Sequence, residues 1–324
     1  GVMERAAGLC LSLAEYWERR GRLREGWLSI GECVMRSDAL RPSHIRANLL
    51  ERAGWIAYLL GEYATSIAWQ TESLELCRLL DYREGLASAL NNLATVRLEQ
   101  GAMQEAADLF RESLAIWREL GDVEKQAARL SNLGLVSLQQ SLYPDAESYL
   151  QEAHALFEQL KDPIGMGGSL CNLSDLALRR KDWLAARELA AGSLQWFRGI
   201  SDRRGIACSL ANLAASTLRL GDYDAADSYV REALTICLET GLRGLAPSLL
   251  EMRSVLLASS RRSMAHFALT ASQTIRERLH ISRSEGEEEL LNQSPVQQQD
   301  GLPEPDRTAI SNMSWEEMLA QVCN

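Results

Sequence analysis

The segment 90-LNNLA-94 decides the fold, because close copies of it return at fixed intervals along the chain. It reappears as 130-LSNLG-134, 170-LCNLS-174 and 210-LANLA-214, each copy displaced by forty residues from the last. A period of this length is typical of stacked helical repeats. Asparagine is roughly 0.5–0.7 kcal/mol worse than alanine in a helix interior. Its recurrence at Asn92, Asn132, Asn172 and Asn212 therefore needs a reason, either in the fold or in a ligand.

The same period covers most of the chain. An apolar column reads Cys10, Leu50, Leu90, Leu130, Leu170, Leu210 and Leu250, and a column of small residues reads Ala14, Gly54, Ala94, Gly134, Ser174, Ala214 and Ser254. Apolar residues fall at i, i+3, i+4 and i+7 twice in each unit, which predicts two amphipathic helices per unit, in the third about 85–100 and 103–120. The predicted fold is all-α, with units of about 7–46, 47–86, 87–126, 127–166, 167–206, 207–246 and a capping unit 247–281.

The end of the chain differs from the repeats. We expect the array to occupy residues 1–281, followed by an acidic, mostly disordered linker over 282–312 with a helical turn near 285–292. Residues 313–324 are predicted to form a short amphipathic helix, because Ser314 and Glu317 make a capping-box pattern. Its apolar residues are Trp315, Met318, Leu319 and Val322. Two fates stay open for this helix: it docks back onto the array as a lid, or another protein binds it.

Composition excludes several classes of function. The net charge is −10, of which residues 282–324 carry −7 and residues 1–281 only −3, a poor footprint for nucleic acid. No apolar run is long enough to span a membrane and the start lacks the pattern of a secretory signal, so we expect a cytoplasmic protein. The seven cysteines form no CxxC pair, and the four histidines lie in different repeats. We expect no metal, no cofactor and no catalytic residues, hence no enzyme.

The repeated columns carry a resemblance to a known family. Leu-x-x-Leu-Gly/Ala, 221-GDY-223 and the alanine three residues after it resemble the tetratricopeptide repeat. The forty-residue unit, with phrases such as 111-RESLAIWRELGD-122, is similar to the repeats of kinesin light chain and of the sensor arms of bacterial STAND ATPases and LuxR-type regulators. The resemblance spans about residues 7–280 and implies a right-handed α-solenoid of about seven helix-turn-helix repeats that binds proteins or peptides.

The asparagine column is the candidate binding site. On a helical wheel it points roughly 150° away from the core columns, and first helices line the inside of such a stack, so the four amides are expected along a concave groove. A primary amide can pair with both the N–H and the C=O of an extended peptide. The resemblance implies this role for Asn92, Asn132, Asn172 and Asn212. Neighbouring groove columns add Asn91, Thr95, Ser131, Asp175, Arg52, Trp55, Arg179 and Arg219.

Other interpretations stay open. Duplication copies residues without need for each copy, and side-chain amides can bond to adjacent helices instead of a ligand. For the whole chain, the first hypothesis is a scaffold that binds a protein or peptide, as the sensor or interaction arm of a larger bacterial regulator. The alternative is an oligomerisation arm without a separate ligand. Because no initiator methionine opens the sequence, we also expect the chain to be the carboxyl-terminal arm of a longer protein.

Overall fold

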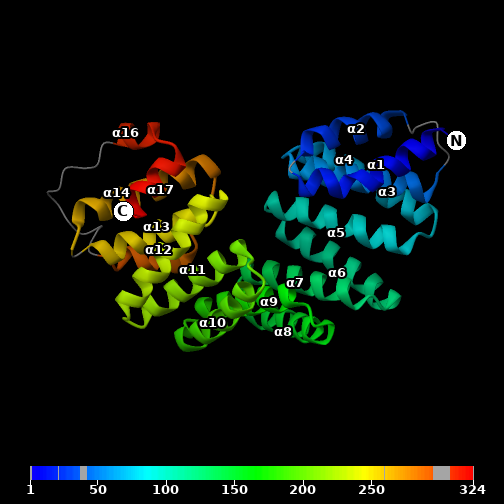
Figure 1. Cartoon of the computed structure of the whole chain (residues 1–324). Coiled ribbons are helices and arrows are strands. Elements are labelled where there is room, and N and C mark those ends of the chain that lie inside the picture. Colours follow the sequence, from blue (N-terminus) through cyan, green and yellow to red (C-terminus); the bar gives the residue numbers. More distant parts are fainter. Residues whose placement is uncertain (1, 21, 37–41, 259, 295–306, 324) are drawn as a thin grey trace. The chain divides into compact units, whose positions relative to one another are not determined.

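The computed structural model describes residues 2–20, 22–36, 42–258, 260–294 and 307–323, and within them all regular structure is α-helical (Figure 1). Among the described residues, the first fourteen helices pair into seven antiparallel hairpins, and three shorter helices follow. The hairpins are α1 (Val2–Arg19) with α2 (Leu23–Arg36), α3 (His44–Leu59) with α4 (Tyr63–Leu79), α5 (Arg83–Glu99) with α6 (Met103–Leu120), α7 (Val123–Gln139) with α8 (Tyr143–Leu160), α9 (Pro163–Arg179) with α10 (Trp183–Gly199), α11 (Arg203–Arg219) with α12 (Tyr223–Thr240), and α13 (Ala246–Leu257) with α14 (Arg262–Leu279). The all-α fold predicted from the period is confirmed.

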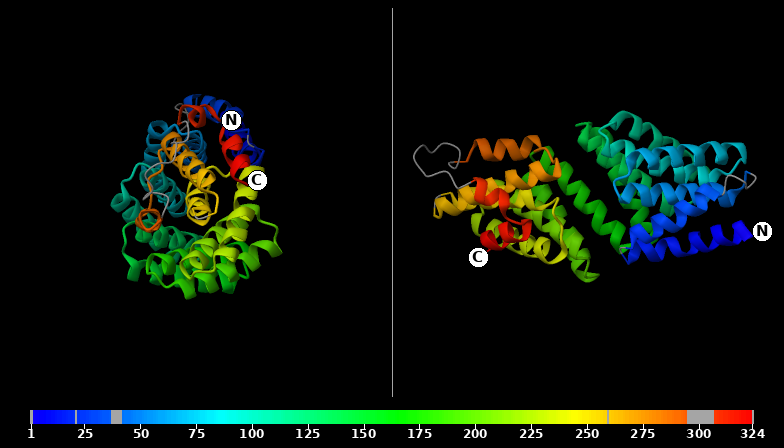
Figure 2. Two further views of the ribbon diagram at one scale, coloured as in Figure 1. Left: turned by 90° about the vertical axis from the view of Figure 1, so that its left-hand side faces the viewer. Right: turned by 90° about the horizontal axis from the view of Figure 1, so that it is seen from above.

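The chain divides into two compact units, Gly1–Leu156 and Phe157–Asn324. Their boundary lies within α8. The limits expected at residues 281 and 312 stay a prediction. Within each unit, successive hairpins lie side by side (Figures 1 and 2). We call the first member of each hairpin (α1, α3, α5, α7, α9, α11, α13) a first helix and its partner a second helix.

Glycine followed by aspartate both ends one helix and begins the next. Gly121 adopts φ 72°, a left-handed conformation that glycine enters without the penalty other residues meet, and it terminates α6. The side chain of Asp122 then accepts a hydrogen bond from the backbone N–H of Lys125 and caps α7. The same cap recurs at Asp182, Asp202 and Asp222. Helix boundaries are therefore encoded locally.

The repeated columns form the core. Leu50, Leu90, Leu130 and Leu210 are fully buried, and the small column on the second helices, Ala106, Ala146, Ala186 and Ala226, is fully buried opposite them. A buried serine also joins the two helices of three hairpins. Ser73, Ser113 and Ser193 donate to the carbonyl oxygens of Ala47, Ala87 and Gly167, at 2.9, 2.7 and 2.8 Å. Each such bond satisfies a buried hydroxyl and sets the height of one helix against the other.

First helices pack directly on one another, α1 on α3 and α3 on α5 in the first unit and α9 on α11 in the second, and so form a layer within each unit. Second helices carry exposed arginine–glutamate pairs between consecutive repeats, such as Arg78–Glu112, Arg118–Glu152 and Arg198–Glu232. Exposed pairs of this kind contribute about 0–1 kcal/mol each, so burial of the apolar columns dominates stability. The exposed side of the first-helix layer is called the first-helix face below.

Three short helices are described in the carboxyl-terminal region after α14. Within the segment expected as a mostly disordered linker, α15 (Glu285–Asn292) and α16 (Arg307–Asn312) are helical, and residues 295–306 lie outside the described part of the chain. The helical turn expected near 285–292 corresponds to α15, while the mostly disordered linker over 282–312 stays a prediction. The last helix, α17 (Trp315–Cys323), has the predicted capping box: Glu317 N–H donates to Ser314 Oγ at 3.1 Å, and Ser314 N–H donates to Glu317 Oε2 at 2.7 Å.

Candidate functional site

On the first-helix face of the unit Gly1–Leu156, polar side chains form a continuous chain across four first helices. The Asn132 Nδ2 on α7 donates to Asn91 Oδ1 at 3.4 Å, and Asn91 Nδ2 donates to Asn92 Oδ1 at 3.1 Å. The Asn92 Nδ2 donates in turn to Glu51 Oε1 on α3. Arg52 Nε lies 3.9 Å from Glu51 Oε2, and its Nη1 lies 3.3 Å from Glu18 Oε1 on α1. We call these six residues the polar chain.

Burial varies along the polar chain. Asn92 is only 7% exposed, whereas Asn91 and Asn132 are half-buried. The sequence prediction pointed the asparagine column away from the core, and the structure shows why Asn92 is nevertheless covered: its amide turns toward Glu51 on the preceding first helix. Asn92, Asn132 and Asn212 all donate to a residue forty-one positions earlier. The periodic amides therefore bridge neighbouring repeats, one of the roles that the sequence left open.

Glu51 is the electrostatic centre of this surface. Its side chain is only 16% exposed, and burial raises its pKa above the ordinary value, opposed by the Arg52 charge and the Asn92 hydrogen bond. The carboxylate therefore depends on these two neighbours for the stability of its charged form. Protonation would remove the acceptor charge at the middle of the polar chain.

Aromatic side chains lie beside the polar chain. The Trp55 and Tyr58 ring centroids are 5.1 Å apart, and Tyr63 lies 6.2 Å from Tyr58. The Tyr58 hydroxyl donates to Glu99 Oε1 at 3.4 Å, and burial together with the Glu99 charge raises the Tyr58 pKa to about 12. Amphipathic rings at a polar surface supply contact area at low entropic cost. Trp55 was a predicted groove residue. Tyr58 was not predicted as one, because it does not belong to the asparagine column or to the neighbouring columns that were assigned to the groove.

In the unit Phe157–Asn324, the predicted residues are less continuous. Asn212 Nδ2 donates to the Cys171 carbonyl oxygen at 3.1 Å, and Asp175 pairs with Arg179 at 3.1 Å. Asn172, like Ser131 in the other unit, is half-buried. Burial, followed by the neighbouring Cys208, raises the Cys171 pKa to about 12, so this thiol stays protonated at neutral pH.

Arg219 contacts a segment that sequence analysis did not expect on this face. Its guanidinium lies 5.5 Å from the centroid of the Trp183 ring and donates to the Gly286 carbonyl oxygen of α15 at 2.9 Å. Sequence patterns could not predict this contact, because Arg219 and Gly286 are sixty-seven residues apart in the chain. A local sign was present: Ser284 and Glu287 form a complete capping box.

The carboxyl-terminal helix docks within its own unit. Trp315, Met318, Leu319 and Val322 are all buried, against α12 and α14 (Figure 1). The Arg243 guanidinium lies 5.3 Å from the Trp315 ring centroid. Intramolecular docking of this helix is therefore confirmed. It is not a lid over the first-helix face, because α12 and α14 are second helices.

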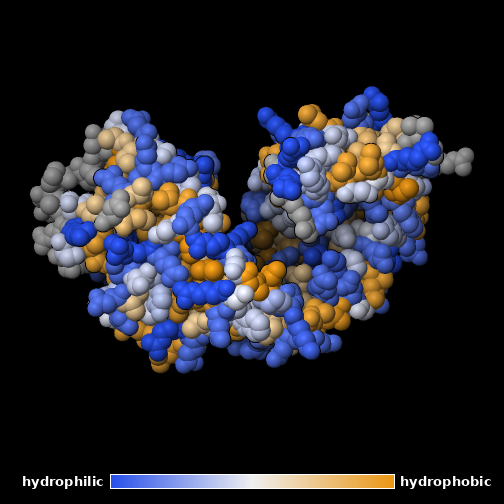
Figure 3. Space-filling view, viewed as in Figure 1, coloured by the Kyte–Doolittle hydropathy of each residue, from blue (hydrophilic) through white to orange (hydrophobic). Residues whose placement is uncertain are grey.

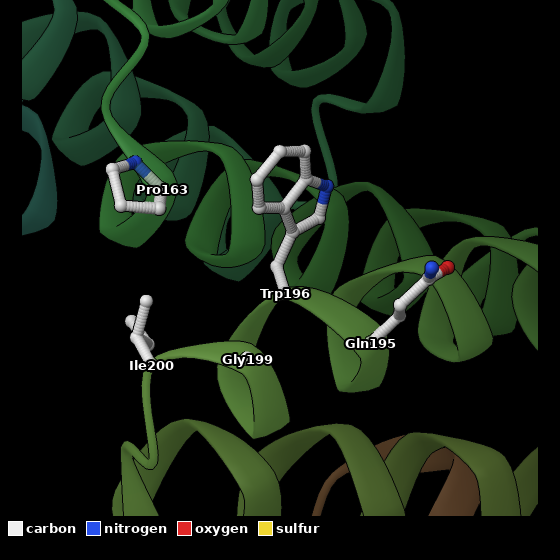
Figure 4. A pocket seen from close by; sticks show the side chains of 5 residues that line it. All are labelled: Pro163, Gln195, Trp196, Gly199 and Ile200. Atoms are coloured by element: carbon white, nitrogen blue, oxygen red, sulfur yellow. The ribbon is translucent and has the colours of Figure 1, made fainter.

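The remaining surface offers few other candidates. A shallow cavity of about 400 Å³ is lined by Pro163, Gln195, Trp196, Gly199 and Ile200, and the Trp196 and Ile200 side chains project from α10 and the turn after it toward the start of α9 (Figure 4). Elsewhere, on the face seen in Figure 3, apolar side chains are scattered among polar ones. No group of three or more potential metal ligands occurs among the described residues. None of the described helices is both long and apolar enough to cross a bilayer.

The repeat architecture agrees with comparisons to known proteins. Residues 45–119, 85–159 and 166–239 match the tetratricopeptide repeat family model. Together these segments cover more than half of the sequence, so the chain belongs to the tetratricopeptide repeat family. By sequence, no curated protein matches.

Solved structures of similar fold include regulators and a sensor. The apo form of RapI aligns with a TM-score of 0.71 at 14% identity, over 85% of this chain and 98% of RapI. A STAND protein with a tetratricopeptide repeat sensor from Pyrococcus horikoshii aligns with a TM-score of 0.67 at 16% identity, over 83% of this chain and 41% of that protein. The Rap conjugation gene regulator of plasmid pLS20, in complex with the Phr* peptide, aligns with a TM-score of 0.62 at 15% identity, over 84% of this chain and 73% of that chain. At these identities the likeness is one of fold.

Proposed function

We propose that this chain is a non-catalytic scaffold that binds a protein or peptide through its first-helix face, as the sensor or interaction arm of a larger bacterial signalling regulator in the cytoplasm. The observation that carries the proposal is the polar chain: amide and carboxylate groups run across four first helices beside Trp55 and Tyr58. A mixed polar and aromatic surface of this kind suits a peptide better than a phosphate backbone.

The amides retain capacity for a ligand. A primary amide offers two donor hydrogens and an acceptor oxygen, so a side chain that makes one intramolecular bond can still pair with a peptide group. Among the amides of the polar chain, Asn132 makes the weakest intramolecular hydrogen bond, because its donor–acceptor distance of 3.4 Å exceeds the usual range. Asn92 makes the strongest, since its amide donates to the buried Glu51 carboxylate and stabilises the charge there.

Similar folds support the choice of ligand class. The pLS20 Rap structure holds the Phr* peptide, and the Pyrococcus horikoshii protein has a sensor built from tetratricopeptide repeats. Stacked repeats deform at their interfaces, so a ligand that bridges several first helices could alter curvature and so influence a linked domain.

The test is a pull-down from the source cell with the purified chain as bait, compared with the Asn132→Ala/Asn172→Ala variant. The expected result is loss of specific partners at unchanged helix content in circular dichroism. The matched control is Gln104→Ala, which removes an exposed amide from the second helix α6 and should retain the partners. Equal capture by all three chains would refute a role for the asparagines in binding.

A second candidate function is an oligomerisation arm. It is favoured by the exposed apolar side chains that line the shallow cavity, where Trp196 is 39% and Ile200 is 36% exposed. Light scattering at micromolar concentration tests it: a stable dimer that Trp196→Ala dissociates would support it, and a monomer would exclude it.

A further inference from the structure

The acidic helix α15 occupies part of the first-helix face of the unit Phe157–Asn324. It packs against the first helix α13, and its side chains reach the carboxyl ends of α9 and α11. An isolated helix of eight residues is not stable in water, so docking supplies the order of this segment. Because an acidic segment becomes helical when it docks on this surface, the surface has the properties of a peptide-binding site.

Two basic side chains contact the open side of α15. Lys181, just after α9, places its Nζ 2.9 Å from Glu289 Oε2, and this contact lowers the Glu289 pKa. Arg219, at the end of α11, donates to the Gly286 carbonyl oxygen at 2.9 Å and to Gln293 Oε1 at 3.2 Å. These contacts lie at solvent-exposed positions, where ion pairs stabilise weakly and exchange easily.

The inner side of α15 is anchored by one carboxylate and one leucine. Glu287 accepts a hydrogen bond from Ser248 and pairs with Arg276 Nη2 at 2.9 Å. Burial disfavours the Glu287 charge, but the bonds from Ser248 and the Ser284 backbone and the charge of Arg276 outweigh burial and lower its pKa. Leu291, one helical turn further on, is 1% exposed. The surface therefore recognises an acid and a leucine four residues apart on one helix face.

We propose that this surface, made by Lys181, Arg219, Ser248 and Arg276, is a docking site for an acidic helical peptide, and that α15 is its built-in competitor. The inference rests on the proposed binding function and adds a partner class: an amphipathic segment with glutamate and leucine at i and i+4. Binding of the partner requires displacement of α15. Its apparent affinity is therefore reduced by the fraction of chains in which α15 is docked.

The probe is a fluorescent peptide of residues 284–293, SEGEEELLNQ, acetylated and amidated at its ends, measured by fluorescence anisotropy against full-length chains. The opened variant Glu287→Gln/Leu291→Ala weakens α15 without altering the surface beneath it. It should bind the probe at least about tenfold more tightly than the wild type does. A peptide with the same two substitutions should not bind.

The surface itself is tested in the opened background. Adding Lys181→Ala and Arg219→Ala should weaken probe binding by about tenfold, while Arg198→Ala should not change it, because Arg198 pairs with Glu232 on the second helices. Equal affinity of wild-type and opened chains, or insensitivity to the paired substitution, would overturn the proposal.

A measurement without substitutions covers the case in which the opened variant folds poorly. In the wild-type chain, excess unlabelled peptide should accelerate hydrogen exchange at residues 285–292 as α15 is displaced, and unchanged exchange would overturn the proposal. Neither assay involves the asparagines. A negative result together with asparagine-dependent partner capture therefore refutes this inference alone.

Discussion

Replacing three of the four repeated asparagines with alanine, one at a time at Asn92, Asn132 and Asn212, should produce a graded loss of stability, although their side chains occupy the same column. The Asn92 amide donates to a buried carboxylate, and hydrogen bonds to charged groups contribute about 1.5–3 kcal/mol. Alanine recovers about 0.5 kcal/mol of helix propensity. Asn92→Ala should therefore destabilise the chain by about 1–2.5 kcal/mol.

The other two substitutions should have smaller effects. Asn212 donates to an uncharged carbonyl oxygen at 3.1 Å, a bond worth about 0.5–1.5 kcal/mol, so Asn212→Ala should change stability by about 0–1 kcal/mol. The Asn132 contact is 3.4 Å long and contributes little, so Asn132→Ala should be neutral or stabilising by up to about 0.5 kcal/mol. The expected order of destabilisation is Asn92, then Asn212, then Asn132.

Urea unfolding followed by circular dichroism measures this series, with midpoints and slopes compared because repeat arrays need not unfold in two states. Burial raises the Glu51 pKa and Asn92 lowers it, so Asn92 stabilises mainly the ionised carboxylate. The penalty of Asn92→Ala should shrink as the pH falls through the raised Glu51 pKa, because the protonated carboxyl gains less from the Asn92 amide. Equal penalties for the three variants, or a pH-independent penalty at Asn92, would refute the role assigned to the polar chain.

Three further outcomes are expected. Because the Glu51 pKa is raised in the folded state, wild-type stability should fall relative to Glu51→Gln as pH rises above the ordinary value of 4.5, and parallel urea midpoints across that range would contradict this. Leu319→Ala should lower the unfolding free energy by about 2–5 kcal/mol, since its side chain is fully buried; an unchanged thermal midpoint would show that α17 does not stabilise the unit. Ser141→Gly should stabilise by about 0.5–1 kcal/mol, because Ser141 holds φ 59° at the position where Gly61, Gly101 and Gly221 stand in other repeats, and calorimetry measures the gain.

Much of the architecture follows from local sequence. The forty-residue period, the Gly-Asp boundaries and the two apolar stripes per unit predict helical hairpins, because each signal acts within a few turns of helix. The helices expected at about 85–100 and 103–120 are observed as Arg83–Glu99 and Met103–Leu120. The buried face of α17 could also be predicted from the sequence, since its four apolar residues lie on one side of a short helix.

Which residues far apart in the sequence contact one another was determined only by the tertiary structure. Periodicity placed Asn92 on a column, but its bond to Glu51 depends on how closely two first helices approach. A helical turn was expected near 285–292, but its contacts with Arg219 and Arg276 come from distant parts of the fold, and composition does not encode them. Side-chain periodicity records which way a residue points along its own helix, whereas the identity of its neighbour depends on the packing of separate helices, a property that no single helix carries.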